Sequence, residues 1–247
     1  MREIDMYKKV LLVKNIAKKF GGLMALEDVS FEVYDQEIVG IIGPNGAGKT
    51  TLFNVISGIH KPDSGEILFR GENLVGLKPH QICKRGIART FQVERLIKGL
   101  SVLENVTIGA AFGGSMTIDQ AQKEAKKWLK FVGIMNINRT VAELTSAERK
   151  ILEIARALAT KPKIMLIDEV LAGLNLKEIL DVVELIKKCK TELGITILWI
   201  EHVMKAIMKT ADRIVVLHNG RKICEGIPME IANNEKVIEA YLGRRYA

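Results

Sequence analysis

One glycine-rich segment constrains the fold of this sequence more than any other feature. It reads Gly43-Pro-Asn-Gly-Ala-Gly-Lys-Thr50 and matches the pattern Gly-x4-Gly-Lys-[Ser/Thr] in full. An apolar run at residues 37–42 precedes it, and residues 52–56 after it are a plausible helix. In that setting the loop exposes successive backbone N–H groups, and the helix N-terminus adds partial positive charge. The segment therefore predicts a phosphate-binding loop rather than an ordinary glycine-rich turn.

The pattern also assigns roles to the side chains of the loop. Lys49 is expected to reach the β- and γ-phosphates of a nucleotide, and the Thr50 hydroxyl is expected to hold Mg²⁺. The glycines let the backbone approach the phosphate oxygens. The residues expected to bind nucleotide here are Gly43, Pro44, Asn45, Gly46, Ala47, Gly48, Lys49, Thr50 and Thr51.

Two acidic residues end a second apolar run. Asp168 and Glu169 follow residues 163–167, and ligands bind at the carboxyl ends of parallel strands. We expect Asp168 to hold Mg²⁺, directly or through water, and Glu169 to polarise an attacking water. On their own, two acids at this position are as easily the start of a loop. Together with the phosphate loop, they favour the functional interpretation.

Two more polar residues are candidates for the same site. His202 follows a predicted strand at residues 195–201, so it is expected at the same sheet edge, within reach of a γ-phosphate. A lone histidine is more often structural, but this position favours a functional one. Gln92 lies in Arg89-Thr-Phe-Gln92, where its residue type alone fits a surface amide and a γ-phosphate sensor equally well.

Strand-like and helical patterns alternate along the chain. Residues 29–33 alternate as a half-buried strand, whereas residues 37–42, 163–167 and 195–200 have the pattern of fully buried strands. Residues 176–186, between the last two, carry apolar side chains at helical spacing. This order predicts an α/β fold with a parallel sheet and crossover helices.

The remaining patterns concern one hairpin and one insertion. Asn219-Gly220 lies between strand-like residues 213–217 and 222–224, which predicts a two-residue hairpin. Residues from about 79 to 158 lack buried-strand runs, and Gly113-Gly114 interrupts them. We therefore expect a single domain over all 247 residues, with a helical subdomain at about 79–158 inserted into the sheet.

Composition excludes several other classes of protein. With 48% hydrophobic and 27% charged residues the chain is not disordered, and 247 residues suffice for one large domain. Its net charge of +8 is spread over short basic pairs, so we expect no nucleic-acid-binding stripe. Three cysteines far apart argue against a disulfide framework or a zinc site. The start, Met1-Arg-Glu-Ile-Asp5, is no secretory signal, and no apolar run is long enough to cross a bilayer, so we expect a soluble protein that reaches a membrane only through a partner.

The helix expected after Leu144 has two interpretations. Thr145 and Glu148 have the spacing of a capping box, and an apolar face runs over residues 151–158. In the first interpretation the helix caps itself and its start faces solvent. In the second, its N-terminal N–H groups face a phosphate.

In chain order, these motifs resemble those of the ATPase subunits of ABC transporters. The phosphate loop, Gln92, Leu144-Thr-Ser-Ala-Glu148, Ile164-Met-Leu-Ile-Asp-Glu169 and His202 carry the resemblance, which covers essentially the whole chain. It implies a P-loop α/β fold with a mainly parallel core sheet, an antiparallel β subdomain and a helical subdomain. It also implies ATP and Mg²⁺ as cofactors and ATP hydrolysis as the reaction.

The resemblance further implies a head-to-tail pair of ATPase subunits. Each ATP is then held between the phosphate loop of one subunit and the signature segment of the other. Phe20 matches the aromatic residue that stacks on adenine, and Ala172-Gly-Leu-Asn175 matches the loop that crosses the dimer interface. The implied catalytic residues are Gln92, Glu169 and His202, the implied magnesium ligands are Thr50, Gln92 and Asp168, and the implied contacts with the partner's ATP are Thr145, Ser146 and Ala147.

Three segments narrow the resemblance to the ATPase subunits of branched-chain amino-acid importers. They are Gly86-Ile-Ala-Arg-Thr-Phe-Gln92 with Leu103-Glu-Asn-Val106, the Ala172-Gly-Leu-Asn175 loop, and the ending Val237-Ile-Glu-Ala-Tyr-Leu-Gly243. Such importers combine two different ATPase subunits with two transmembrane permease subunits and, indirectly, an extracytoplasmic binding protein. The resemblance implies a location at the cytoplasmic face of the cell membrane and no nucleic-acid partner.

Two positions depart from the family pattern. Leu144-Thr-Ser-Ala-Glu148 replaces the usual signature Leu-Ser-Gly-Gly-Gln, and Val170 replaces the proline that usually follows the catalytic glutamate. Ala147 adds a methyl group where the backbone must approach a phosphate, and Glu148 adds a negative charge. We therefore expect a heterodimer with unequal sites, in which the site built with this signature holds ATP but turns over slowly.

Three other functions compete with the uptake of branched-chain or related amino acids. An ATPase of similar build that drives export of a lipid or glycolipid resembles this chain less around residues 89–92. A soluble ABC protein acting on nucleic acid or ribosomes usually has two phosphate loops or a long coiled coil, and this sequence has neither. Intact Glu169 and His202 argue against a regulatory subunit that binds ATP without turnover.

Overall fold

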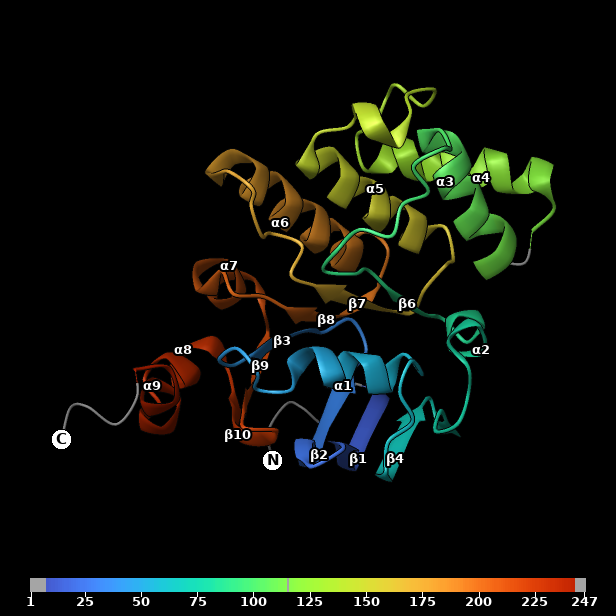
Figure 1. Cartoon of the computed structure of the whole chain (residues 1–247). Coiled ribbons are helices and arrows are strands. Elements are labelled where there is room, and N and C mark those ends of the chain that lie inside the picture. The colour runs from blue at the N-terminus through green and yellow to red at the C-terminus, as the bar shows by residue number, and fades with distance from the viewer. Residues whose placement is uncertain (1–7, 115, 243–247) are drawn as a thin grey trace.

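A six-stranded sheet lies at the centre of the computed structural model, which describes residues 8–114 and 116–242 (Figure 1). Residues 1–5 and Gly243, on which expectations were placed above, lie outside the described residues. The edge strand formed by residues 221–226 runs antiparallel to its neighbour, and the other five strands run parallel to one another. In spatial order the strands are β10 (Arg221–Gly226), β9 (Arg213–His218), β3 (Ile38–Ile42), β8 (Thr196–Ile200), β7 (Ile164–Asp168) and β6 (Ile87–Arg89).

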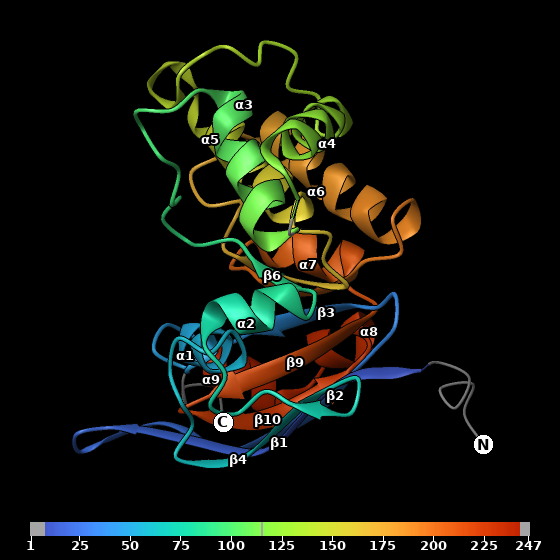
Figure 2. The same ribbon diagram turned by 90° about the vertical axis from the view of Figure 1, so that its right-hand side faces the viewer.

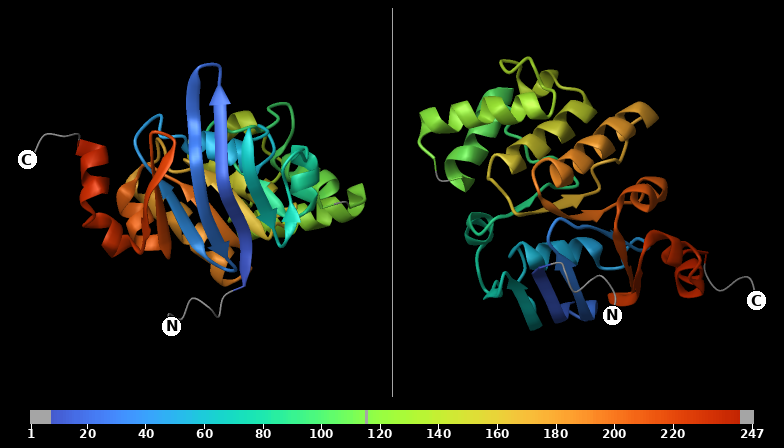
Figure 3. Two further views of the ribbon diagram at one scale, coloured as in Figure 1. Left: turned by 90° about the horizontal axis from the view of Figure 1, so that it is seen from below. Right: turned by 180° about the vertical axis from the view of Figure 1, so that it is seen from behind.

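A smaller antiparallel sheet faces one side of the central sheet (Figures 1 and 2). Its strands are, in spatial order, β2 (Leu23–Tyr34), β1 (Lys9–Phe20), β4 (Ser64–Phe69) and β5 (Glu72–Asn73). Helix α1 (Lys49–Ile56) lies between the two sheets, where Leu52 and Phe53 share an apolar core with Val39 and Ile41 of β3. The β1–β2 hairpin extends past the rest of the molecule (Figure 3).

Helices cover the opposite side of the central sheet, where Ile38 and Ile42 of β3 join a second apolar core (Figure 1). In chain order these are α3 (Val102–Ile108), its π-helical continuation η2 (Gly109–Gly113), α4 (Ile118–Phe131), the short 3-10 helix η3 (Val141–Glu143), α5 (Ser146–Leu158) and α6 (Leu176–Thr191). Shorter helices complete the molecule (Figure 2): α2 (Pro79–Lys84), α7 (Met204–Thr210), α8 (Pro228–Ala232) and α9 (Glu235–Leu242).

The expectations drawn from long local patterns are confirmed. The continuous apolar runs form β3, β7 and β8, in which every residue is buried, as parallel strands covered on both faces should be. The alternating run lies within β2, and Asn219-Gly220 joins β9 to β10 as a hairpin. The helix expected after the phosphate loop is α1, and the one between β7 and β8 is α6.

One expectation about residues 79–158 is wrong. The segment does contain a buried strand, because β6 pairs in parallel with β7 at the edge of the central sheet. Ile87 and Ala88 are buried, but three residues are too short to stand out as a run. The rest of the segment is largely helical, and η2 ends at the expected Gly113-Gly114 break.

Candidate active site

The phosphate-loop segment folds as a loop that only glycine can form at two positions. Gly43 and Gly48 have φ of 151° and 98°, and a β-carbon on either would meet a backbone oxygen. At Gly43 that oxygen belongs to Leu217 of β9, 2.0 Å away, and at Gly48 it belongs to Ala25 of β2, 2.5 Å away. The loop is therefore pressed between β9 and β2 as it leads into the N-terminus of α1.

Lys49 folds back onto its own loop. Its Nζ donates to the backbone oxygen of Gly43 at 2.7 Å and to that of Pro44 at 2.9 Å. The residue is buried, and this burial lowers the pKa of its ammonium group, while the nearby Glu169 and Asp168 act against the shift. The ammonium group therefore lies within the loop. To bind a phosphate, it has to give up its bonds to these two backbone oxygens.

A cavity of about 1110 Å³ opens beside this loop. The β1–β2 hairpin supplies Phe20, Leu23 and Met24 at one end, and the turns after β7 and β8 supply Glu169 and His202 at the other. Between them lie the expected loop residues Asn45, Gly46, Ala47, Gly48, Lys49, Thr50 and Thr51. The structure thus brings most of the expected nucleotide contacts to one cavity, which has both apolar and polar lining residues.

The Glu169 carboxylate contacts two side chains from other parts of the chain. Gln92 Nε2 donates to its Oε2 at 2.6 Å, and His202 Nε2 lies 2.7 Å from its Oε1. The backbone of Glu169 has φ 48°, a left-handed conformation that is uncommon for a residue with a β-carbon and that clusters at functional sites. Its N–H donates to Ile200 of β8 at 2.9 Å, which holds the turn in place. Three expected catalytic residues therefore meet at one carboxylate.

Asp168 is the buried carboxylate beneath this group. Its Oδ2 accepts from Arg89 at 2.9 Å, while Oδ1 has no hydrogen-bond partner among the described residues. Burial raises the pKa of Asp168, and the Arg89 guanidinium opposes that shift. A buried oxygen without a partner is costly, so Oδ1 has an unused capacity to accept a hydrogen bond or to bind a metal ion, although Asp168 does not line the cavity in this structure.

These residues fit magnesium only in company with a nucleotide. Among the described residues, no three His, Cys, Asp or Glu side chains gather closely enough to hold a metal ion. Mg²⁺ is commonly bound by one or two protein oxygens together with substrate phosphates and water. Asp168 Oδ1 and the exposed Thr50 supply such oxygens, whereas the side chain of Gln92 is directed at Glu169.

Sequence reasoning missed Glu201, which holds two turns of the site together. Its Oε1 accepts the N–H of Leu171, after β7, at 2.7 Å, and its Oε2 accepts the N–H of His202, after β8, at 3.1 Å. Glu201 is buried, which raises the pKa of its carboxyl. Glu201 could have been recognised as a polar residue directly after an apolar strand, but the functional role was assigned to His202, the next residue.

Glu153 of α5 was also missed, and it fixes the backbone on both sides of Gln92. Its carboxylate accepts the N–H of Phe91 at 3.3 Å and that of Arg95 at 3.2 Å. Arg156, one turn further along α5, donates to the backbone oxygen of Arg95 at 2.5 Å. The Gln92 segment is thus bound to α5, the helix whose N-cap is Thr145.

The start of α5 caps itself, as the spacing of Thr145 and Glu148 predicts. Thr145 Oγ1 accepts the N–H of Glu148 at 3.2 Å, and Glu148 Oε2 accepts the N–H of Thr145 at 2.8 Å. Arg139, which sequence reasoning missed, holds both oxygens of Glu148 at 2.6 and 3.1 Å and keeps its pKa below the usual value. The negative charge expected at this helix start is therefore paired.

Thr145, Ser146 and Ala147 do not line the cavity, and neither do the expected site residues Gly43, Pro44 and Asp168. Thr145 and Ser146 are exposed at the start of α5, whereas Ala147 is buried. A helix start with exposed N–H groups can receive an anion from outside the chain. The helix start caps itself and is exposed at Thr145 and Ser146, so self-capping does not prevent it from facing a phosphate outside this chain.

Comparison with known proteins gives matches over nearly the whole chain. A family model described as "ABC transporter" matches residues 26–172, and one described as "Branched-chain amino acid ATP-binding cassette transporter" matches residues 221–247. The high-affinity branched-chain amino acid transport ATP-binding protein LivG of Escherichia coli K12 is 42% identical, over 96% of this chain and 99% of that protein.

Solved structures agree with these sequence matches. A nucleotide-free ATP-binding cassette from an ABC transporter has a TM-score of 0.87 and 33% identity, over 96% of this chain and all of that one. A dimeric ATP-binding cassette in a post-hydrolysis state, bound to ADP and Pi, has a TM-score of 0.79 and 30% identity, over 88% of this chain and 98% of that one. The fold is therefore shared with these ATP-binding cassettes.

Proposed function

The chain belongs to the ABC transporter family of ATPases, and on this premise we propose that it binds ATP in the cavity beside the phosphate loop and hydrolyses it to power membrane transport. The observation that carries the proposal is the Glu169 carboxylate, which Gln92 and His202 contact at 2.6 and 2.7 Å. A carboxylate held in one orientation beside phosphate-binding groups can take the proton of an attacking water.

Each part of the cavity has a separate task in this proposal. Phe20 of the cavity lining stacks on adenine, and the loop N–H groups with Lys49 bind the phosphates. Thr50 and Asp168 hold Mg²⁺, which supplies charge neutralisation at the phosphates. Gln92 and His202 orient Glu169, and both also line the cavity where the γ-phosphate would lie. Contact with the γ-phosphate would therefore change how they hold the Glu169 carboxylate.

A second ATPase subunit completes the assembly that we propose. A related cassette forms a dimer when bound to ADP and Pi, which supports pairing. The exposed start of α5, with Thr145 and Ser146, lies away from this chain's own cavity and is free to meet the nucleotide of a partner. We infer a head-to-tail arrangement in which each subunit supplies a phosphate loop to one ATP and a helix start to the other.

We further propose that the cargo is a branched-chain or related amino acid, taken up into the cell. The name of the E. coli relative and the match of residues 221–247 support this substrate class. No helix in the described ranges is long and apolar enough to cross a membrane. In the complex that we propose, two permease subunits cross the membrane, a binding protein lies outside, and this chain docks on the permeases at the cytoplasmic face.

The helices α3 to α5 support a further proposal about domain organisation. They form a layer on one side of the central sheet and lie between β6 and β7 in the chain (Figure 1). We propose that residues from about 79 to 158, apart from β6, are a helical subdomain inserted into one domain that spans the chain. Its junction with the sheet contains Gln92, so a movement of the subdomain would displace that side chain.

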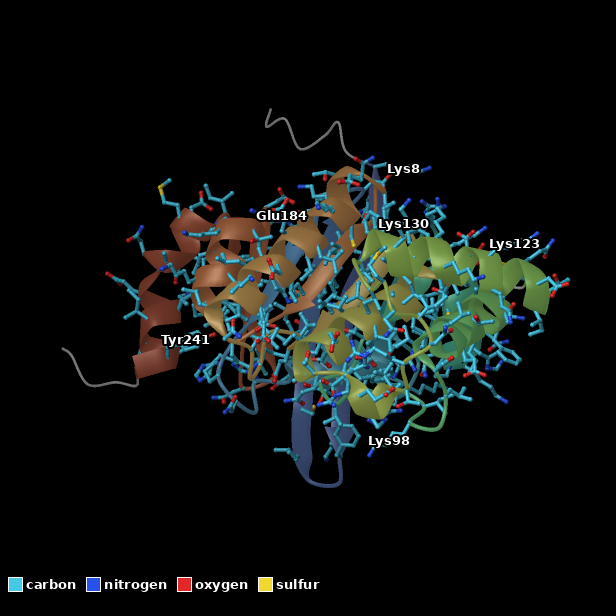
Figure 4. All side chains as sticks on the ribbon, turned by 90° about the horizontal axis from the view of Figure 1, so that it is seen from above. Lys8, Lys98, Lys123, Lys130, Glu184 and Tyr241 are labelled. Carbon is cyan, nitrogen blue, oxygen red and sulfur yellow. The ribbon has the colours of Figure 1, made fainter. Side chains whose placement is uncertain are left out.

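The distribution of positive charge favours this transport role over binding to nucleic acid. In the view of Figure 4, Lys8, Lys98, Lys123 and Lys130 point outward at separate places around the molecule. A nucleic-acid site usually gathers its basic residues into one stripe or patch.

Ligand-induced stabilisation of the purified chain tests the assignment of the cavity. At about 100 times the dissociation constant, MgATP should stabilise the fold by about 2.7 kcal/mol. Lys49→Ala should abolish most of the corresponding thermal shift, whereas Lys123→Ala, on the exposed face of α4, should keep it. An equal shift in wild type and Lys49→Ala would show that the phosphate loop does not bind ATP.

A further inference from the structure

Arg89 is a charged side chain buried at the end of the edge strand β6. Only 6% of its side chain is exposed, and the side chain of its ion-pair partner Asp168 is 1% exposed. The bond joins Arg89 Nη2 to Asp168 Oδ2 at 2.9 Å. Buried ion pairs contribute little to stability on average, because desolvation offsets the attraction. We therefore look for a role of this buried ion pair other than stabilising the fold.

Arg89 also contacts the C-terminal end of α1, the helix that begins at the phosphate loop. Its Nη1 donates to Asn54 Oδ1 at 2.7 Å and to Ser57 Oγ at 3.0 Å. The guanidinium also lies 5.6 Å from the ring of Phe53 and 5.0 Å from that of Phe91. One planar group thus joins α1 with Lys49, β6 with Gln92 after it, and β7 with Asp168 at its end.

This contact fixes one side of the Asp168 carboxylate, which is buried next to Glu169 and is not part of the cavity lining. With Oδ2 bound to Arg89, and with the N–H of Asp168 donating to Thr90 Oγ1 at 3.2 Å, the carboxylate cannot turn freely. The other oxygen, Oδ1, is buried and has no partner among the described residues. A carboxylate that bonds to the protein through one oxygen and keeps the other free is the usual arrangement of a metal ligand with a supporting partner.

We propose that Arg89 is the positioning residue of the magnesium–nucleotide site. It fixes Oδ2 of Asp168 so that Oδ1 can bind Mg²⁺. Through Asn54 and Ser57, it also holds Asp168 at a set distance from α1 and the phosphate loop. This inference rests on the proposed function, since it assumes that MgATP occupies the cavity. Lysine cannot replace arginine in this role, because an ammonium group lacks the planar fork that reaches three acceptors on two elements.

The test measures metal binding directly as well as turnover. Mn²⁺ is titrated into the protein with a non-hydrolysable ATP analogue, and free Mn²⁺ is followed by electron paramagnetic resonance. Loss of a group that orients a metal ligand typically weakens metal affinity by about 10- to 100-fold, and we expect this for Arg89→Met and Arg89→Lys. Binding of the analogue without metal should stay within about twofold of wild type, because the phosphate loop is unchanged. Arg85→Met, which removes an exposed arginine on the nearby α2 end, is the matched control.

A double-mutant cycle separates positioning from packing. If Arg89 acts through Asp168, then Arg89→Met should weaken Mn²⁺ binding in wild type but have little further effect in Asp168→Asn. The double variant also removes the unpaired buried charge, so it remains folded if Arg89→Met alone does not. Wild-type Mn²⁺ affinity in Arg89→Lys, or equal losses in both backgrounds, would overturn the inference.

Failure of this inference is distinguishable from failure of the proposed function. If Lys49→Ala loses the ATP-induced thermal shift while the Arg89 variants keep wild-type metal affinity, the cavity binds MgATP and only the role of Arg89 is wrong. If Lys49→Ala keeps the shift, the nucleotide site itself is wrong, and the role of Arg89 falls with it.

Discussion

His202 Nε2 lies 2.7 Å from Oε1 of Glu169, so the turns after β8 and β7 touch at one carboxylate oxygen. The second oxygen of Glu169 is occupied by Gln92, from the segment after β6. Three neighbouring strands of the central sheet therefore each send a side chain to the same point. A carboxylate restrained on both sides has little freedom to turn, which suits a base that must face one water molecule.

Replacing this carboxylate by an amide should separate ATP binding from hydrolysis. Glu169→Gln keeps the shape of the side chain but cannot take a proton, so hydrolysis should fall by about 10²- to 10⁴-fold. ATP affinity should persist, because the phosphate loop is intact, and the ATP-bound dimer should accumulate. Phosphate release and size-exclusion chromatography measure the two effects, with Glu184→Gln on the exposed face of α6 as control. Near-normal turnover would mean that another residue activates the water.

Glu201 should matter for the stability and the geometry of the same turns. Its two oxygens accept N–H groups from both turns, and the NH₂ group of glutamine cannot accept either bond. Glu201→Gln should leave one buried N–H unpaired and lower the free energy of unfolding by about 1–3 kcal/mol. Turnover should fall more than ATP affinity, since His202 and Glu169 lose their alignment.

Denaturant unfolding and steady-state kinetics measure these effects of Glu201→Gln together. Glu192→Gln, at an exposed position, provides the baseline for replacing a carboxylate. A variant with wild-type unfolding and wild-type turnover would show that the two turns hold their positions without this carboxylate.

The Arg139–Glu148 pair should make stability depend on pH in a defined direction. Arg139 lowers the pKa of Glu148 from 4.5, so the folded chain binds this proton less tightly than the unfolded chain. The contribution is present above about pH 4.5 and disappears as pH falls through the lowered value. Wild type should therefore exceed Glu148→Gln in melting temperature at neutral pH, and the two should converge in acid. A difference that does not change with pH would rule out this linkage.

We expect the two ATP sites of the assembled transporter to be unequal. The structure pairs the charge of Glu148 with Arg139, which leaves Ala147 as the main obstacle at this helix start. Lys49→Ala should abolish most hydrolysis by the complex, whereas the equivalent change in the partner should spare most of it. Ala147→Gly should raise the activity of the weaker site. The opposite ranking of the two lysine variants would reverse the asymmetry.

Local patterns were enough to predict the parallel core and most of the cavity. Continuous apolar runs can be recognised within one segment, and the phosphate loop is a contiguous motif whose shape follows from its glycines. The ends of β7 and β8 had to lie at one sheet edge once both were parallel strands, so the meeting of Glu169 and His202 followed from topology.

The supporting contacts could not be predicted in the same way. Arg89 and Asp168 are 79 residues apart, and Glu153 holds backbone about 60 residues earlier in the chain. Asp168 could be recognised at the end of an apolar run, but its pairing with Arg89 could not, because a buried ion pair becomes visible only when both segments are placed. The same holds for β6, since three residues form a strand only because β7 offers an edge.

The back-folded Lys49 has a consequence for the cycle of successive turnovers. We expect the loop to keep its shape when product leaves, because Lys49 Nζ bonds to two of its backbone oxygens, those of Gly43 and Pro44. The next nucleotide then needs one side chain to swing, and no backbone has to be ordered again. We therefore expect reloading to need a local exchange of hydrogen bonds at Lys49 and no refolding of the loop.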